Sequence, residues 1–300
     1  MRVKRLVALT AILLVCSLIF SAISVTEADA LYDRDAFSEA EQELLVQLGK
    51  ASNAEEEAQV LWRLARVMVS LGDDLDENDK TGRFALYEKG ETYALSSIEK
   101  HPTSLGYLWK SSNIGRWGQT KGPLNALGKA KGMLEDLTVI VNDFKTLDSS
   151  ETWYVLSSLY DELPGGIISF GNKDWAVSYM RMALDTIPSH LLYPGHYKKL
   201  AEELYARNWS ASKRSKELPK IQKDWQKAAT NLEKYRYYEG KDGGATKPFY
   251  SSVDLTRMSD RQEAVMVLSY ILEKAKVFRP IKATDTKELQ EIEALRNSWI

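Results

Sequence analysis

Cysteine is almost absent from this sequence, with Cys16 the single example in 300 residues. Because Cys16 lies in an apolar N-terminal segment, the rest of the chain can form no disulfide and offers no thiol nucleophile or thiolate metal ligand. A fold without cross-links depends on packing for its stability. The eight tryptophans and fifteen tyrosines are consistent with a large, well-filled interior.

Histidine is also scarce, and the three examples are His101, His190 and His196. No two of them have the four-residue spacing that places two imidazoles on one helical face for zinc binding. The sequence also lacks a nucleophile-elbow serine and a phosphate-binding glycine loop followed by Lys-Ser or Lys-Thr. Adjacent carboxylates such as Glu202 and Glu203 are typical of a solvated helix. We therefore predict that the protein is not an enzyme, has no catalytic residues and needs no cofactor.

One acidic segment has part of a metal-binding pattern. Asp74, Asp76 and Asn78 have the first three ligand spacings of an EF-hand calcium loop. However, Asp79 stands where that loop needs glycine for a sharp turn, and Ala85 stands where it needs a bidentate glutamate. We interpret the segment as a solvated loop and predict no metal site.

Long apolar runs are confined to the N-terminus. Three basic residues precede an apolar stretch that extends to about Ile23, and the triplet Ala28-Asp29-Ala30 follows. This order is that of a secretory signal peptide, so we predict that residues 1–30 are a signal peptide cut after Ala30. The protein is then expected to be exported to the periplasm or another extracytoplasmic space. The alternative is an uncleaved membrane anchor, because the apolar run is close to the shortest length that spans a bilayer.

An excess of charge of one sign is missing too. The 40 basic and 42 acidic residues nearly cancel, so nothing favours nucleic acid or an anionic membrane surface as a partner. No second apolar run approaches the length of a membrane span. We therefore expect contact with a membrane only through the N-terminal segment, and only if that segment is not cleaved.

Helical periodicity is abundant, and it repeats. Apolar residues recur at spacings of three and four, whereas alternating β-branched runs are nearly absent. Two segments end in proline and have mostly small side chains 12, 8 and 5 positions before it. They are Gly90, Ala94 and Ser97 before Pro102, and Ala176, Met180 and Ala183 before Pro188. Small side chains let two helices approach closely, and proline ends the second helix of each pair.

Each repeat also has a first helix with an aromatic residue, and in the first unit the small Ala65 is expected to let a neighbouring helix approach closely. These helices are predicted at 58–72, 105–118, 150–163 and 194–206. The aromatic residue at the corresponding position steps from Trp62 to Trp109 to Tyr154, which is a longer period than the 34 residues of a standard tetratricopeptide repeat. We predict a repeat domain over residues 31–218. Further helices at 220–238, 259–278 and 286–299 are expected to complete the same domain within residues 219–300.

Two segments carry a resemblance to a known family. YLWKSSNIGRWGQTKGPLNALGKAKG and SSLYDELPGGIISFGNKDWAVSYMRMAL resemble tetratricopeptide (TPR) repeats of a long type. Over about residues 55–218, the chain is similar to the TRAP-transporter-associated protein TatT and to the regulator of microtubule dynamics family. The resemblance implies an all-α, TPR-like right-handed superhelix of antiparallel helix pairs. It departs from TatT at Val15, which precedes Cys16 where a lipoprotein needs a small residue.

The same resemblance implies a binding surface, because fixed positions of each first helix line the concave face of such a stack. In our register the predicted binding residues are Trp62, Arg66, Trp109, Asn113, Arg116, Trp117 and Tyr154. Aromatic and arginine side chains gathered on one face are typical of a binding hot spot. We predict that this face binds a protein partner or a small apolar or carboxylated ligand. The alternative is that the tryptophans only pack between long helices.

The resemblance to TatT implies a second possible function. In that interpretation the protein is an accessory component of a TRAP-type solute transport system, and it passes its ligand to the TRAP-type binding protein. Arg66 and Arg116 would then bind the carboxylate of the ligand.

Overall fold

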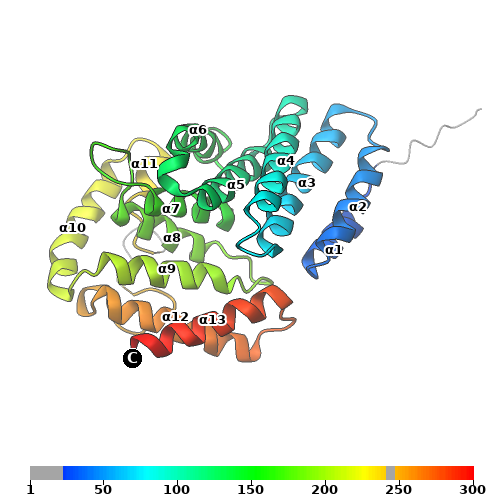
Figure 1. The fold of residues 1–300 in the computed structure, drawn as a ribbon. Helices are drawn as coiled ribbons and strands as arrows, with labels where there is room; N and C mark the ends of the chain where they lie inside the picture. Colours follow the sequence, from blue (N-terminus) through cyan, green and yellow to red (C-terminus); the bar gives the residue numbers. More distant parts are fainter. Residues whose placement is uncertain (1–22, 241–246) are drawn as a thin grey trace, which may run out of the picture.

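We analysed a computed structural model, which describes residues 23–240 and 247–300. No residue in these two ranges lies in a strand, and most lie in helices. The prediction of an all-α protein is therefore confirmed. Figure 1 shows the helices arranged side by side along much of the chain, with the C-terminal helices returning beneath α9.

The thirteen α-helices of the described ranges follow the order of the sequence. The first seven are α1 (Thr26–Asp33), α2 (Phe37–Leu48), α3 (Ala54–Asp74), α4 (Lys80–Lys100), α5 (Ser104–Lys121), α6 (Leu127–Thr138) and α7 (Ser150–Glu162). The other six are α8 (Lys173–Asp185), α9 (Pro194–Arg207), α10 (Ala211–Lys227), α11 (Asn231–Tyr235), α12 (Asp260–Val277) and α13 (Ala283–Trp299). Short helical turns are η1 (Pro123–Ala126), η2 (Val139–Asp143) and η4 (Leu255–Arg257).

Three of the helices predicted to open a repeat begin after a capping side chain. Asn53, Thr103 and Ser149 precede α3, α5 and α7, and each accepts a hydrogen bond from a backbone N–H of the first turn. Such a cap satisfies one of the N–H groups that have no partner within the helix. The four helices predicted to open a repeat, at 58–72, 105–118, 150–163 and 194–206, correspond in residue range to α3, α5, α7 and α9.

The small residues before the two prolines are buried, as their spacing predicts. On α4, Gly90, Ala94 and Ser97 are buried, and Ser97 Oγ donates a hydrogen bond to the carbonyl of Ala58 on α3 at 2.9 Å. Ala65 and Ala183 are fully buried, which confirms their predicted positions at helix contacts. The close approach of α3, α4 and α5 thus depends on side chains that are absent or short.

Two clusters of buried apolar residues form the core. The smaller one joins α1 and α2 to α3, through residues such as Ala28, Leu44 and Leu64. The larger one extends from α5 to α13 and includes Trp153 and Ile292. The C-terminal helices therefore share one core with the repeat region, and α12 packs mainly against α9.

The region around residue 218 differs from its prediction. We expected a helix over 220–238, but α10 runs through the exposed Pro219 and ends at Lys227, and the short α11 follows. On the buried side of this helix, Arg214 binds carboxylates of α12. The predicted boundary at 218 consequently falls inside α10.

The predicted signal peptide lies partly outside the described residues. From Thr26 onward, however, the chain forms α1, in which Ala28 is only 1% exposed. Asp29 of α1 accepts hydrogen bonds from Arg63 Nε at 3.0 Å and from Arg66 Nη2 at 2.7 Å. The folded unit therefore begins before Leu31, and a cut after Ala30 would remove part of a packed helix. No helix in the described part of the chain is both long enough and apolar enough to cross a membrane.

Candidate functional site: a cavity between the helices

A cavity of about 540 Å³ lies between the N-terminal helices, the repeat helices and α13. Its walls come from helices far apart in the sequence. They include Tyr32 of α1, Arg66 of α3, Trp109 of α5, Tyr154 of α7, His196 of α9 and Glu288 of α13. The volume is within the range of sites that enclose small molecules.

Four of the seven predicted binding residues line this cavity, namely Arg66, Trp109, Arg116 and Tyr154. They come from α3, α5 and α7, which is the set of first helices used for the prediction. The spacing of the repeat thus brings these side chains to one place in the fold.

The other three predicted residues lie elsewhere. Asn113 is fully buried, and its Nδ2 donates hydrogen bonds to the carbonyls of Ala65 and Trp109 at 3.0 and 2.7 Å. Trp62 is 5% exposed and does not line the cavity. Trp117 packs against Phe84 at a ring-centroid distance of 5.6 Å. For these three residues the packing interpretation describes their surroundings better than the ligand-facing one.

Arg116 is held inside a chain of polar contacts. Its Nε lies 3.0 Å from Asp73 Oδ2, and its Nη1 donates to Gln119 Oε1 at 2.9 Å. Gln119 Nε2 donates in turn to Glu162 Oε1 at 2.6 Å, which ties the end of α5 to the end of α7. Burial alone would lower the pKa of Arg116, but Asp73 acts together with Tyr154, Tyr87 and Glu162, and their combined effect raises the pKa. Arg116 is therefore a fixed cation whose charge is already paired.

Arg66 is fixed in a similar way at the other side of the cavity. Its Nη2 donates to Asp29 Oδ1 at 2.7 Å, and its guanidinium carbon lies 3.8 Å from the centre of the Tyr32 ring. A guanidinium over an aromatic face is attracted by the ring quadrupole. The N-terminal helix α1 thus supplies both the carboxylate and the ring that orient Arg66.

His196 is stacked between two tyrosines. Its ring centroid lies 4.6 Å from that of Tyr154 and 4.9 Å from that of Tyr193. Burial lowers the pKa of His196 to about 3, so the imidazole is neutral near pH 7. Tyr193 adopts a left-handed backbone conformation with φ of 48°, which is unusual for a bulky residue. Its hydroxyl donates to Glu151 Oε1 at 2.6 Å.

Several buried polar atoms on the cavity wall have no partner among the described residues. They are Arg66 Nε, Trp109 Nε1, Ser158 Oγ and His196 Nε2. Buried polar atoms usually form hydrogen bonds, because an unpaired one costs about 1–3 kcal/mol. These four atoms belong to residues that line the cavity but are buried behind its surface, so a ligand in the cavity reaches them only if the wall moves.

Sequence reasoning missed the walls that lie outside the repeat positions. Tyr32, Tyr193, His196 and Glu288 belong to no repeated pattern that we used. No local signal marked Tyr193, because a residue before proline is expected to be extended, whereas Tyr193 adopts a left-handed conformation. The contribution of α1 and α13 had no local signal either, because it depends on how the ends of the chain meet.

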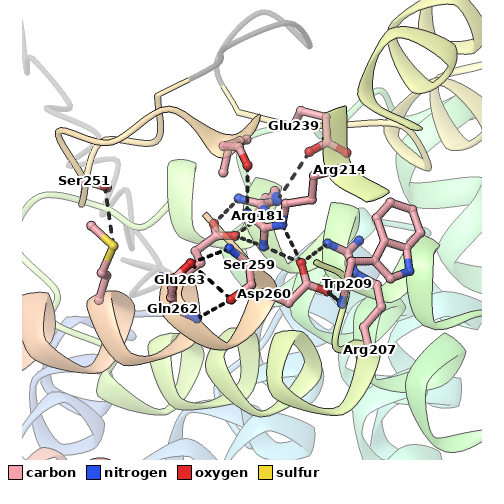
Figure 2. Close-up of polar contacts among 12 residues, drawn as sticks. Arg181, Arg207, Trp209, Arg214, Glu239, Ser251, Ser259, Asp260, Gln262 and Glu263 are labelled. Carbon is pink, nitrogen blue, oxygen red and sulfur yellow. Dashed lines mark hydrogen bonds and ion pairs between the residues drawn. The ribbon is translucent and has the colours of Figure 1, made fainter. Parts of the chain in front are cut away.

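A second polar cluster, shown in Figure 2, lies away from the cavity. Arg181 of α8 donates to both carboxylate oxygens of Glu263 at 2.6 and 2.9 Å. Arg214 of α10 binds Glu263 and Asp260, and Arg207 of α9 binds Asp260. Its charges are paired and buried, and the space beside them is too small for a ligand. We interpret the cluster as a buried ion-pair network that holds α8, α9 and α10 against α12.

No group of three or more residues of the metal-binding types is placed to hold an ion in the described ranges. In the acidic segment, Asp74 lies in α3, and Asp76 accepts a hydrogen bond from the backbone of Asn78 at 2.8 Å.

No protein-family model and no curated protein matches this chain. The fold and the site define the class as an all-helical protein with a cavity lined in part by aromatic side chains.

Proposed function

We propose that the protein is an exported, non-catalytic, TPR-like binding protein and that its ligand lies in the cavity described above. The main support is that Arg66, Trp109, Arg116 and Tyr154 come from three helices to one cavity of about 540 Å³. Small-molecule sites of this kind combine aromatic walls with a few placed polar groups. Export rests on the pattern of the N-terminal sequence.

A small ligand is favoured over a protein partner at this place. Its lining comes from eight helices, which include both α1 and α13, whereas a protein partner needs an open face of about 800 Å². Binding is favoured over catalysis because the imidazole of His196 contacts the aromatic rings of Tyr154 and Tyr193. Its buried Nε2 has no hydrogen-bonded nucleophile among the described residues.

Native mass spectrometry of the protein, purified without denaturation, tests this proposal. The expected result is a bound small molecule that is released on denaturation. Ser158→Leu would fill part of the cavity and should abolish the added mass, whereas Ser298→Leu, at an exposed position of α13, should retain it. Equal ligand content in both variants would place the ligand elsewhere and contradict the proposal.

A second candidate function is transfer of the ligand to a TRAP-type solute-binding protein. It is supported by the loop after Leu163, a residue that lines the cavity, because Ile167 and Ile168 in that loop are strongly exposed. Exposed apolar residues beside a ligand site are typical of a docking surface. Sedimentation of the protein with such a binding protein should show a complex that Ile167→Ser with Ile168→Ser weakens. Val277→Ser removes an equally exposed apolar side chain on α12 and should leave the complex intact.

A further inference from the structure

We propose that the cavity binds an organic cation, in which a protonated amine is attached to an aromatic or other apolar body. This inference rests on the proposed function, since it requires that the cavity holds a small molecule. It names the charge of that molecule and replaces the earlier expectation of a carboxylated ligand.

Acidic side chains outnumber basic ones around the cavity. Three lining residues in the described ranges are arginine or lysine, namely Arg66, Arg116 and Lys282. Seven are aspartate or glutamate, and they are Asp33, Asp35, Asp73, Glu151, Glu162, Asp285 and Glu288. With every carboxyl ionised, seven negative and three positive groups leave the lining with a formal charge of −4.

The three cations of the lining already have carboxylate partners. The pairs are Arg66 with Asp29 at 2.7 Å, Arg116 with Asp73 at 3.0 Å and Lys282 with Asp33 at 3.6 Å. An anionic ligand would have to displace one of these carboxylates. Because Asp29 does not itself line the cavity, only two of the seven lining carboxylates are paired in this way. The other five form no ion pair with the described residues.

Three of those five are glutamates that have only neutral partners. Their donors are the Tyr193 hydroxyl for Glu151, the Gln119 amide for Glu162 and the backbone N–H of Gly195 for Glu288, at 2.6, 2.6 and 2.8 Å. Each bond uses one carboxylate oxygen, and the second oxygen accepts no hydrogen bond from the described residues. None of these second oxygens is among the buried unpaired polar atoms, so each keeps accessible surface on a residue that lines the cavity. They are acceptors for a donor on the ligand.

The charge separates a cation from an uncharged ligand here. A hydroxyl or amide group can donate to one of these oxygens, but it leaves the negative charge of the lining unchanged. An ammonium group donates up to three hydrogen bonds and also neutralises one charge, and this attraction is stronger where water is partly excluded. Burial raises the pKa of Glu288, and the nearby Asp285 and Glu291 act in the same direction. A carboxylate that is short of cations responds in this way.

The apolar part of the lining suits the body of such a ligand. Tyr32, Trp109, Tyr154 and Tyr193 all line the cavity. One cation already lies on an aromatic face of this lining, because the guanidinium carbon of Arg66 is 3.8 Å from the centre of the Tyr32 ring. Sites that combine aromatic rings with negative charge are typical of organic ammonium ligands.

Three probes that share one ring system test the inference. They are 2-naphthylmethylamine, which is cationic at pH 7, 2-naphthalenemethanol, which is uncharged and of the same size, and 2-naphthoate, which is anionic. Binding of each to the full chain is measured by isothermal titration calorimetry. We expect the dissociation constant of the amine to be at least about tenfold lower than those of the other two, since one added charge contact at a partly buried site has an effect of this order.

Variants then test which carboxylates bind the amine. Glu288→Gln removes the charge but keeps an oxygen that accepts from Gly195, so it should weaken the amine about three- to tenfold and leave the alcohol unchanged. Glu291→Gln is the matched control on the same helix, because Glu291 binds Lys198 at 2.7 Å and does not line the cavity. Glu162→Gln is a second cavity variant with the same expected effect, and it is used alone if Glu288→Gln unfolds in a thermal melt.

The outcomes separate the two proposals. If 2-naphthalenemethanol or 2-naphthoate binds as tightly as the amine, the inference is overturned while the cavity remains a ligand site. A preference for the amine that both glutamate variants retain in full overturns the assigned carboxylates. If none of the three probes binds, the inference fails as well, and native mass spectrometry then decides the proposed function separately.

Discussion

Asp35 Oδ2 accepts hydrogen bonds from Thr284 through its backbone N–H at 3.0 Å and its Oγ1 at 3.1 Å, joining residues 249 positions apart. Lys282 Nζ, 3.6 Å from Asp33 Oδ1, forms a second contact beside it. All four residues line the cavity. In Figure 1, the first turn of α13 correspondingly lies closest to α1. The two ends of the described chain therefore close one wall of the site.

The first prediction concerns this closure. Asp35→Ala should speed hydrogen exchange of backbone amides at Thr284 and in α1, because the contact is exposed and is expected to contribute only about 1 kcal/mol. Hydrogen–deuterium exchange with mass spectrometry measures this effect. Asp76→Ala is the control, since Asp76 bonds only within its own loop. Unchanged exchange at Thr284 would mean that the contact does not close the wall.

The fold was far more predictable from sequence than the site. Helices follow from local patterns, and the small residues at Gly90 and Ala183 reported helix contacts correctly because packing constrains them directly. The cavity depends on contacts such as Asp35 with Thr284, which no local pattern encodes. Trp62 was assigned to the concave face by register alone, yet its indole Nε1 donates to Gln59 at 3.0 Å and Arg63 lies over its ring. Contacts with Gln59 and Arg63 of its own helix thus hold the Trp62 side chain.

The second prediction compares two glycines. A Cβ at Gly90 would lie 2.0 Å from Asn113 Oδ1 and 2.5 Å from its Cγ. Gly90→Ala should therefore destabilise the protein by about 1–3 kcal/mol through overpacking. At Gly132 of α6 a Cβ would meet nothing within 4 Å, so Gly132→Ala should stabilise by about 0.5–1 kcal/mol. Urea unfolding of both variants checks the opposite signs, and two changes of the same sign would contradict the packing of α4 on α5.

The third prediction concerns the ion pair of Arg116. Arg116→Met should destabilise the protein by about 1–3 kcal/mol, because the Asp73 carboxylate, which is a third exposed, then keeps only the Tyr87 hydroxyl and Arg83 Nη2 at 4.0 Å. Adding Asp73→Asn should recover part of that loss, since the stranded charge is then removed. A double-mutant cycle on thermal or urea unfolding measures the coupling. Additive effects of the two substitutions would show that the pair contributes nothing.

The fourth prediction concerns the start of the folded chain. A chain that begins at Leu31 lacks Ala28 and Asp29, so Arg63 and Arg66 lose their shared carboxylate. We expect it to be less stable than a chain beginning at Ile23 by about 2–3 kcal/mol, in line with hydrogen bonds to charged groups. Asp29→Asn in the longer chain should show part of the loss. N-terminal sequencing of the exported protein from its host then tells which form exists, and a start at Leu31 with undiminished stability would make α1 dispensable.

The last prediction concerns the pH dependence of the stability contributed by the buried ion-pair network in Figure 2. Burial alone would raise the pKa of Glu263, but Arg181 and Arg214 outweigh it and lower the pKa to about 2 from the usual 4.5. A lowered pKa means that the unfolded chain binds the proton first. The stabilisation is therefore complete above about pH 4.5 and is lost as the pH falls toward 2.

Glu263→Gln should accordingly cost about 3–5 kcal/mol at pH 7, because two buried guanidinium groups lose a shared carboxylate. The difference from the parent protein should shrink as the pH falls from 4.5 toward 2, where the parent also loses that charge. Urea unfolding at pH 7, 4.5 and 3 measures both effects. Glu273→Gln, on the same helix but 70% exposed at its side chain, should change stability by less than about 0.5 kcal/mol. If the loss of unfolding free energy for Glu263→Gln stays constant with pH, the charge of Glu263 does not stabilise the contact of α8 and α10 with α12. Packing of the Glu263 side chain would then account for its contribution.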